Sequence, residues 1–273
     1  MGGSTTPCPW RIDFRSSVGY IAFILSIMVE IAVVIPAYNE ETTIASVVDA
    51  VLETHETVIV VNDASTDSTS TSLNGKPIRL VNLPQNFGKA GALSVGFDEA
   101  TKMGANAVIT MDGDGQHEAK DIVKFLAAAR KYPNALVIGS RETNTEQAPK
   151  ARLFANKFAN FWISWASGMA ISDSQCGFRL YPLAIIQRLR LKTDKSHSFV
   201  FESEVVIEAC RNGFELVSVP IRSYYPENRR KSHFRPIIDI ARITQMVALK
   251  LLARGLYIRG LINALNGQPK LIR

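Results

Sequence analysis

The first half of this chain alternates apolar runs with helical patterns, and this alternation restricts the fold more than any other feature. The apolar runs are residues 31–35, 58–61, 78–81, 107–111 and 136–138. Patterns typical of helices lie between several of them, at residues 41–53, 89–101 and 118–131. Strands that alternate with helices form βαβ units, so we predict an α/β fold with a mainly parallel, Rossmann-like sheet flanked by helices.

The second half of the chain has a less regular pattern. The elements expected there are a helix, a strand, a helix and a strand, at residues 150–167, 177–181, 201–212 and 214–221. A long apolar pattern then covers residues 236–266 and is interrupted at Gly255 and Gly260. A chain of 273 residues is long enough for one large α/β domain. We expect this domain at residues 28–235 and an amphipathic helical tail at residues 236–273.

The N-terminal segment contains the most apolar window of the chain, residues 18–36. Glu30 lies inside it, and no window has the 18 or more uninterrupted apolar residues of a spanning helix. Residues 31–35 are better explained as the first core strand, and no small-residue cleavage site follows residues 18–28. We therefore expect Met28 to be the natural start and residues 1–27 to be an extension with little structure.

Charge is distributed unevenly along the chain. Residues 222–273 contain 11 Lys/Arg and 2 Asp/Glu, a balance of +9, whereas the preceding 221 residues have 20 and 23, a balance of −3. A basic tail on a near-neutral body indicates an anionic partner, either phosphate, a lipid headgroup or nucleic acid. The apolar pattern after Pro236 fits a helix lying in a membrane interface, or equally a terminal helix packed on the domain. Nucleic acid fits less well, because the aromatic residues there lie in apolar or turn contexts.

Cysteine usage indicates the compartment. Cys8, Cys176 and Cys210 form neither a disulfide framework nor a metal-binding spacing. Such a sparse, odd set is typical of reduced thiols in the cytosol. We therefore expect a cytoplasmic protein. Together with the basic, apolar tail, this indicates a protein that is peripheral at the inner face of the cell membrane.

Common nucleotide-binding fingerprints are missing. The turn after the first apolar run has no G-x-G-x-x-G, and no Walker lysine motif occurs in the chain. These absences argue against a dehydrogenase or a P-loop enzyme. A sugar nucleotidyltransferase is also disfavoured, because it should have a Gly-rich, Arg-containing loop after its first strand.

Polar clusters follow each of the first four expected strands. They are residues 36–40 (PAYNE), 62–67 (NDASTD), 86–91 (NFGKAG) and 112–117 (DGDGQH). The carboxyl ends of parallel strands meet at one edge of the sheet, where open α/β proteins bind ligands. We therefore expect these clusters to converge on one site.

The last of these clusters offers metal ligands. Asp112, Asp114 and Gln116 supply hard oxygen atoms of the kind that bind Mg²⁺ or Mn²⁺. An Asp-Gly-Asp-Gly string is also common in ordinary turns. It does not continue as a calcium-binding loop, because His117 and Val123 occupy the places that require Gly and Glu.

Taken together, the ordered clusters resemble the motifs of family-2 glycosyltransferases, which have the GT-A fold. The resemblance covers about residues 31–231 and rests on VVIPAYNE (33–40), VNDAS (61–65), NFGK (86–89) and DGD (112–114). Further segments resemble the polyprenyl- or dolichyl-phosphate hexose synthases within that family: DGDGQH (112–117), GSR (139–141), GFR (177–179) and VPI (219–221). The ordered set is specific, although each piece alone is weak.

This resemblance implies roles for individual residues. Donor binding is expected from Pro36, Ala37, Tyr38, Glu40, Val61, Asp63, Lys89, Asp112, Gly113 and Asp114. Asp112, Asp114 and Gln116 match the positions around the metal ion, Mg²⁺ or Mn²⁺, and the diphosphate. Arg141 and Lys89 would add positive charge near phosphate, and Arg suits bidentate phosphate contact.

The acceptor side is less defined. A hydroxyl acceptor needs a general base, and the possible bases are Asp173, our first choice, Glu202 and Glu204. A phosphate acceptor needs none. The chain lacks the Glu-Asp pair of many hydroxyl-directed relatives and the Gln-x-x-Arg-Trp of processive synthases, which favours a phosphate acceptor. Contacts to acceptor or phosphate are expected from Arg152, Arg179, Glu202, Arg229 and Lys231.

The hypothesis from the sequence is an inverting, metal-dependent hexosyltransferase. It would move a hexose from a UDP- or GDP-sugar to a polyprenyl phosphate at the membrane surface, with Asp114, Asp173 and Arg141 as its catalytic residues. One alternative is transfer to a hydroxyl of an envelope glycan or lipid. Another is a non-catalytic protein that binds nucleotide-sugars.

Overall fold

Four parallel strands form one half of a seven-stranded sheet. They are β1 (Ile31–Ala37), β2 (Val58–Asn62), β3 (Arg79–Asn82) and β4 (Ala107–Thr110). The computed structural model describes residues 30–141, 150–189, 200–222 and 236–272. The strand order in the sheet is β3-β2-β1-β4-β6-β5-β7. Every residue of β2 and β4 is buried, as a central strand covered on both faces requires.

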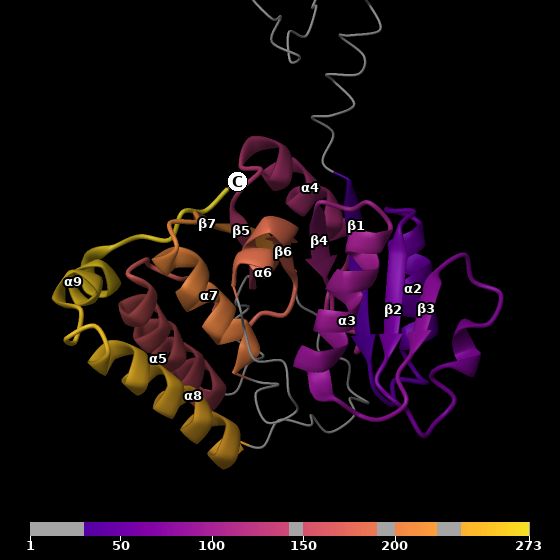
Figure 1. The fold of residues 1–273 in the computed structure, drawn as a ribbon, viewed down its shortest axis with the longest axis horizontal. Helices are drawn as coiled ribbons and strands as arrows, with labels where there is room; N and C mark the ends of the chain where they lie inside the picture. The colour runs from indigo at the N-terminus through magenta and orange to yellow at the C-terminus, as the bar shows by residue number, and fades with distance from the viewer. Residues whose placement is uncertain (1–29, 142–149, 190–199, 223–235, 273) are drawn as a thin grey trace, which may run out of the picture.

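Helices cover both faces of this sheet (Figure 1). The first half contains α2 (Ile44–Leu52), α3 (Gly88–Lys102) and α4 (Ile122–Lys131). The α/β alternation predicted from the sequence is confirmed. The helix expected from residue 118 begins later, at Ile122, because a short 3₁₀ turn (Ala119–Asp121) precedes it.

The second half adds β5 (Leu136–Arg141), α5 (Lys150–Ser167), β6 (Arg179–Pro182), α6 (Leu183–Arg188), α7 (Phe201–Arg211) and β7 (Leu216–Ile221). β6 runs antiparallel between β4 and β5, and its first residue, Arg179, pairs with Thr110 at the carboxyl end of β4. The segment just before β6 is therefore brought to the edge at which β1, β2 and β4 end.

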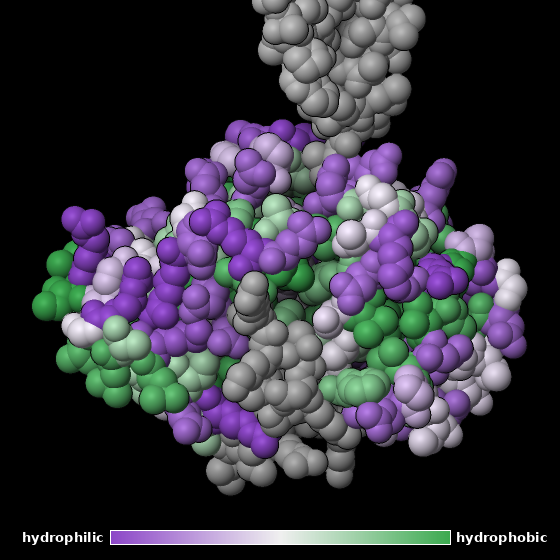
Figure 2. Space-filling view, in the orientation of Figure 1, coloured by the Kyte–Doolittle hydropathy of each residue, from purple (hydrophilic) through white to green (hydrophobic). Residues whose placement is uncertain are grey.

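Two C-terminal helices, α8 (Pro236–Leu252) and α9 (Ile258–Asn266), pack against α5. The chain then returns to the sheet, where the Ser218 N–H donates to the Lys270 carbonyl oxygen at 2.8 Å. The predicted interruption at Gly255 is confirmed, but Gly260 lies inside α9. Hydrophobic residues remain at the surface over α8 and α9 (Figure 2). Among the described residues, no helix has both the length and the apolar character needed to cross a membrane.

Candidate active site

The loops that follow β1 and β2 are tied to each other. The Asn39 N–H donates to Ser65 Oγ at 2.8 Å, and the Thr66 N–H donates to Asn39 Oδ1 at 2.7 Å. Asn39 and Ala64 both have φ of 55°. This conformation costs a non-glycine residue on the order of 1–3 kcal/mol and persists where the surrounding contacts hold it. The predicted convergence of these two polar clusters is confirmed.

Asp63 connects the same edge to the start of α3. Its Oδ1 accepts the Phe87 N–H at 2.7 Å and its Oδ2 accepts the Gly88 N–H at 2.8 Å. The residue is only 3% exposed. Asp63 thereby fixes the turn that presents Lys89. The contact of Asp63 to a nucleoside base stays a prediction.

Lys89 lies between two carboxylates from different elements. Its Nζ is 2.6 Å from Asp112 Oδ1 and 3.0 Å from Glu202 Oε1, at the start of α7. Burial opposes the charged ammonium, but the two carboxylates outweigh it and raise the pKa of Lys89 above its usual value. The sequence-predicted residues Lys89, Asp112 and Glu202 therefore form one cluster.

Gly177, from the segment before β6, lies directly against this cluster. A β carbon at Gly177 would be 2.6 Å from Asp112 Oδ2 and 2.7 Å from Lys89 Nζ. Its carbonyl oxygen accepts the hydroxyl of Thr110 at 2.8 Å. A side chain at position 177 would therefore displace the ends of the Asp112 and Lys89 side chains. The sequence showed Gly177 as part of a motif but gave no sign of this contact.

The two carboxylates of the acidic segment differ in their electrostatics. Burial disfavours ionisation of Asp112, but the Lys89 ammonium together with His117 and Arg179 outweighs burial and holds the pKa of Asp112 below its usual range. Burial, followed by the charge of Asp112, raises the pKa of Asp114. Gln116 donates to Asp114 from its backbone N–H at 3.0 Å and from its side-chain amide at 2.5 Å. The ionised form of Asp114 is therefore compensated only incompletely by its neighbours.

This donor set fits a hard divalent cation. Within the described parts of the chain no group of three or more His, Cys, Asp or Glu is arranged to hold a metal. Mg²⁺ commonly uses only one or two carboxylates and takes its other ligands from water and substrate phosphates. Asp112, Asp114 and the Gln116 amide oxygen could supply such a partial set, and a cation there would compensate the charge of Asp114.

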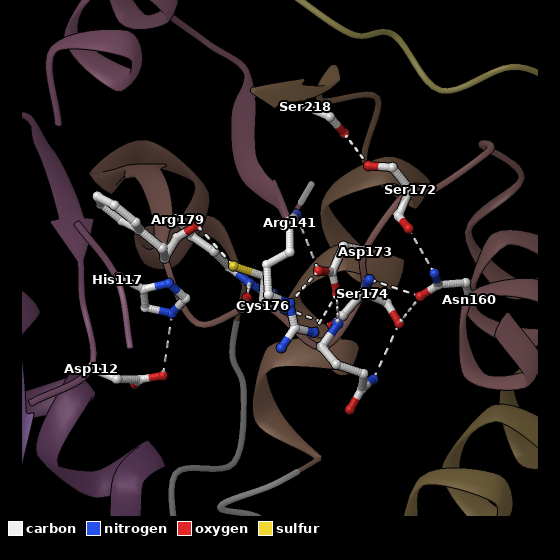
Figure 3. A network of polar contacts seen from close by, with 12 residues as sticks. Asp112, His117, Arg141, Asn160, Ser172, Asp173, Ser174, Cys176, Arg179 and Ser218 are labelled. Atoms are coloured by element: carbon white, nitrogen blue, oxygen red, sulfur yellow. Dashed lines mark hydrogen bonds and ion pairs between the residues drawn. The ribbon is translucent and has the colours of Figure 1, made fainter. Parts of the chain in front are cut away.

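His117 extends the acidic segment toward the other side of the site. Its Nε2 is 3.9 Å from Asp112 Oδ2 (Figure 3). Its ring packs on Phe178 at a centroid distance of 5.4 Å. Its Nδ1 is buried without a hydrogen-bond partner in the described structure. Burial lowers the pKa of His117, although Asp112 and Asp114 oppose the shift. Sequence reasoning did not name His117 as a site residue.

Arg141 and Asp173 form a bidentate ion pair opposite the acidic segment (Figure 3). Arg141 Nε is 2.6 Å from Asp173 Oδ2, and its Nη2 is 2.9 Å from Oδ1. The side chains are 12% and 9% exposed. Both Asp173 oxygens thus accept from Arg141, and Oδ1 also accepts the Gln175 N–H at 3.2 Å. This arrangement supports Asp173 as the residue that orients Arg141, instead of the free base we expected.

Arg179 has a structural role, which corrects the expectation that it contacts the acceptor. It is fully buried and donates to the carbonyl oxygens of Cys176 at 2.6 Å, Ser174 at 2.8 Å and Glu202 at 2.7 Å. Its guanidinium thereby links the segment before β6 to α7. A fully buried guanidinium that donates to three backbone carbonyls is not accessible to an incoming phosphate.

Asn160 on α5 fixes the segment that carries Asp173. Its Nδ2 donates to the Ser172 carbonyl at 2.7 Å, and its Oδ1 accepts the Ser174 N–H at 2.8 Å. Sequence reasoning missed this residue, because a single Asn in a helical pattern has no distinguishing signal.

The remaining predicted positions lie in different environments. Ala37 and Val61 are buried strand residues, so their side chains belong to the core and only their backbone could face a ligand. Pro36 and Tyr38 are partly exposed at the end of β1. The Gly113 carbonyl accepts the Thr43 hydroxyl at 2.7 Å, and the Glu40 N–H donates to Thr69 Oγ1 at 2.7 Å.

Three predicted positions cannot be placed in the site. Arg152 is in α5, but its side chain lies outside the described part of the structure. Arg229 and Lys231 lie outside the described residues.

The fold is similar to that of GT-A glycosyltransferases. The family described as "Glycosyl transferase family 2" matches residues 32–186, more than half of the chain. The chain therefore belongs to glycosyltransferase family 2, and it is a glycosyltransferase. The fold class and the family expected from the sequence are confirmed.

Among similar proteins are enzymes named for lipid phosphates. The UDP-N-acetylglucosamine–dolichyl-phosphate N-acetylglucosaminyltransferase of Methanococcus voltae is 29% identical over 219 residues, covering 72% of this chain and 86% of that protein. The polyprenol monophosphomannose synthase of Mycolicibacterium smegmatis is 30% identical over 201 residues, covering 69% and 75%.

Solved structures show a similar fold. The glucosyl-3-phosphoglycerate synthase from Mycobacterium tuberculosis, in complex with Mn²⁺, UDP and glucosyl-3-phosphoglycerate, has a TM-score of 0.58 and 19% sequence identity. The match covers 92% of this chain and 86% of that one.

Proposed function

We propose that this glycosyltransferase moves a hexose from a UDP- or GDP-sugar to a polyprenyl phosphate, with inversion at the anomeric carbon, at the cytoplasmic face of the membrane. The observation that carries the proposal is the incompletely compensated Asp114 at an edge that also presents Lys89 and the ion-paired Arg141. The names of the Methanococcus and Mycolicibacterium relatives support the acceptor class.

The chemistry follows from the leaving group. A departing nucleoside diphosphate gains negative charge, and fixed cationic groups aimed at that charge lower the barrier. Lys89 and Arg141 are suited to this role, because Asp63 fixes the turn before Lys89 and Asp173 orients the Arg141 guanidinium. Mg²⁺ or Mn²⁺ held by Asp112, Asp114 and Gln116 would supply Lewis-acid stabilisation of the diphosphate. The complex of the structural neighbour with Mn²⁺ and UDP supports this cofactor class.

A phosphate acceptor is favoured over a hydroxyl by the state of the possible bases. Asp173 is paired with Arg141, Glu202 with Lys89, and Glu204 with Lys250 at 3.0 Å. A general base must direct an oxygen at the hydroxyl proton, whereas these carboxylates direct theirs at cationic side chains. An anionic phosphate oxygen can attack without such a base.

The test begins with donor binding. UDP- and GDP-sugars are screened with Mn²⁺ by thermal shift, because a ligand that binds only the folded state raises the melting temperature. The nucleotide that stabilises the protein is then used with a short-chain polyprenyl phosphate and, as the matched control, the corresponding free polyprenol. We expect transfer to the phosphate only. Transfer to the free alcohol at a similar rate would contradict the phosphate acceptor, and absence of any metal-dependent nucleotide shift would contradict the donor site.

A further inference from the structure

We propose that the outward face of α8, α9 and the turn between them docks on an anionic lipid bilayer. Six of the eleven large hydrophobic side chains that are exposed in the described residues lie within this short stretch. These six, which we call the C-terminal apolar face, are Leu249, Leu252, Leu256, Ile258, Ile262 and Leu265. Their exposed fractions run from 52% to 69%, and Figure 2 shows hydrophobic surface where α8 and α9 lie. Soluble surfaces rarely gather exposed hydrophobic residues in this way without a binding role.

The orientation of α9 is fixed by close packing on its inner side. Ile258, Ile262 and Leu265 recur at i, i+4 and i+7, so they form one stripe along the helix. On the inner side a β carbon at Gly260 would be 2.4 Å from the Trp165 carbonyl oxygen of α5. This close approach leaves no room for α9 to rotate the stripe inward.

The turn between the helices holds its apolar side chain outward under strain. Leu256 and Tyr257 have φ of 62° and 37°, in the left-handed region that non-glycine residues disfavour. The Trp165 indole N–H donates to the Leu256 carbonyl at 2.9 Å, and the Arg254 guanidinium lies 4.2 Å from the centre of the Tyr257 ring. These contacts keep Leu256 at the surface, where it is 52% exposed.

Charge identifies an anionic bilayer as the occupant. Arg254 and Arg259 are both exposed beside the apolar side chains. Residues 222–273 carry a net charge of +9. Exposed arginines next to an apolar stripe are the features of a helix that lies in a membrane interface, where cations attract anionic headgroups and apolar side chains enter the acyl boundary.

The position of α8 relates this face to the active site. The carboxyl ends of β1, β2 and β4 lie at the lower edge of the sheet in Figure 1, and α8 begins on this lower side. α8 therefore connects the side of the sheet where the site lies to the C-terminal apolar face, which is at the far end of α8 and in α9. The inference is linked to the proposed function because a polyprenyl phosphate resides in a membrane. Vesicle binding is measured without donor or acceptor, so the two proposals can fail separately.

The experiment is co-sedimentation of the full chain with vesicles of phosphatidylcholine alone or mixed in equal parts with phosphatidylglycerol. We expect binding to the mixed vesicles, and the triple variant Ile258→Gln, Ile262→Gln, Leu265→Gln should lower the partition coefficient at least about tenfold. The double variant Arg254→Gln, Arg259→Gln should lower it roughly tenfold on the mixed vesicles only. The matched control replaces two exposed hydrophobic residues elsewhere, Met103→Gln and Val123→Gln, and should bind as the unchanged protein does.

Several results would overturn the proposal. They are no binding of the unchanged protein to mixed vesicles, equal loss in the control variant, and full binding of both the triple and double variants. A dimer that the triple variant converts to monomers, without vesicle binding, would assign the face to a second copy of the chain. Melting temperatures of all variants should agree within a few degrees, because every replaced side chain is exposed. If the triple variant fails to fold, binding of the double variant to the mixed vesicles still tests the proposal.

Discussion

Asp114, in the acidic segment after β4, and Asp173, in the segment before β6, show two uses of a carboxylate that is partly or fully buried. Asp173 accepts both contacts of the Arg141 guanidinium, so its charge is compensated within the protein. Asp114 lies near Asp112, accepts hydrogen bonds from Gln116 alone among the described residues, and has its pKa raised by burial. Compensated charge stabilises the fold and orients Arg141. Incompletely compensated charge weakens the fold and remains available for a cation, so substitutions at the two positions should have opposite effects.

The largest effect is expected for Asp114→Asn. Loss of a carboxylate that holds the cation and diphosphate should lower kcat/KM by about a thousandfold. The same change relieves repulsion with Asp112, so the melting temperature without metal should rise by roughly 2–4 °C, the shift that about 1 kcal/mol gives in a domain of this size. Asp98→Asn, on the exposed side of α3, is the matched control and should change neither quantity. Full activity of Asp114→Asn would refute its role.

Asp173→Asn should act in the opposite direction on stability. The change leaves the Arg141 guanidinium, 12% exposed, without its anionic partner and should cost about 3 kcal/mol in the free energy of unfolding, measured with urea. The control is Glu215→Gln, which breaks the exposed pair with Lys270 at 3.2 Å and should cost less than about 0.5 kcal/mol. Equal losses in the free energy of unfolding of the two variants would show that the Arg141–Asp173 pair stabilises the fold no more than an exposed ion pair does.

The same contrast explains what could be predicted from the sequence. In the first half, short apolar runs alternate with helical patterns, and parallel strands oblige the polar clusters after them to meet at one edge. In the second half, β6 reverses direction, and a strand of only four residues (RLYP) carries no sign of its orientation. That reversal buries Arg179 against backbone carbonyls and places Asp173 where it forms an ion pair with Arg141. Whether a charged residue contacts a ligand or another part of the chain depends on such long-range contacts, so we assigned both residues from their motifs alone.

Gly177→Ala would test how tightly the segment before β6 packs against Asp112 and Lys89. The added β carbon would lie 2.6 Å from Asp112 Oδ2 and 2.7 Å from Lys89 Nζ. Both atoms are ends of side chains that can shift, so the free energy of unfolding should change by less than about 1 kcal/mol. The shift would nevertheless displace the acidic segment, and kcat/KM should fall about tenfold, since a displacement of this order degrades alignment at a reacting centre. Unchanged kinetics would mean that the position of Asp112 is not critical.

The smallest effect concerns pH, and it separates the two carboxylates of the acidic segment. A raised pKa means that Asp114 binds its proton more tightly in the folded chain than in the unfolded one. Its contribution to stability is therefore present below the ordinary carboxyl pKa of 3.8 and is lost as the pH rises through the folded value. The lowered pKa of Asp112 gives the reverse: its contribution is present above the ordinary value and is lost as the pH falls through the folded one. Without metal, the melting-temperature gain of Asp114→Asn should grow from acidic pH toward neutrality, whereas Asp112→Asn should show a loss that grows over the same range. If the melting temperature changed in the same direction in both variants, Lys89 would not distinguish the two carboxylates.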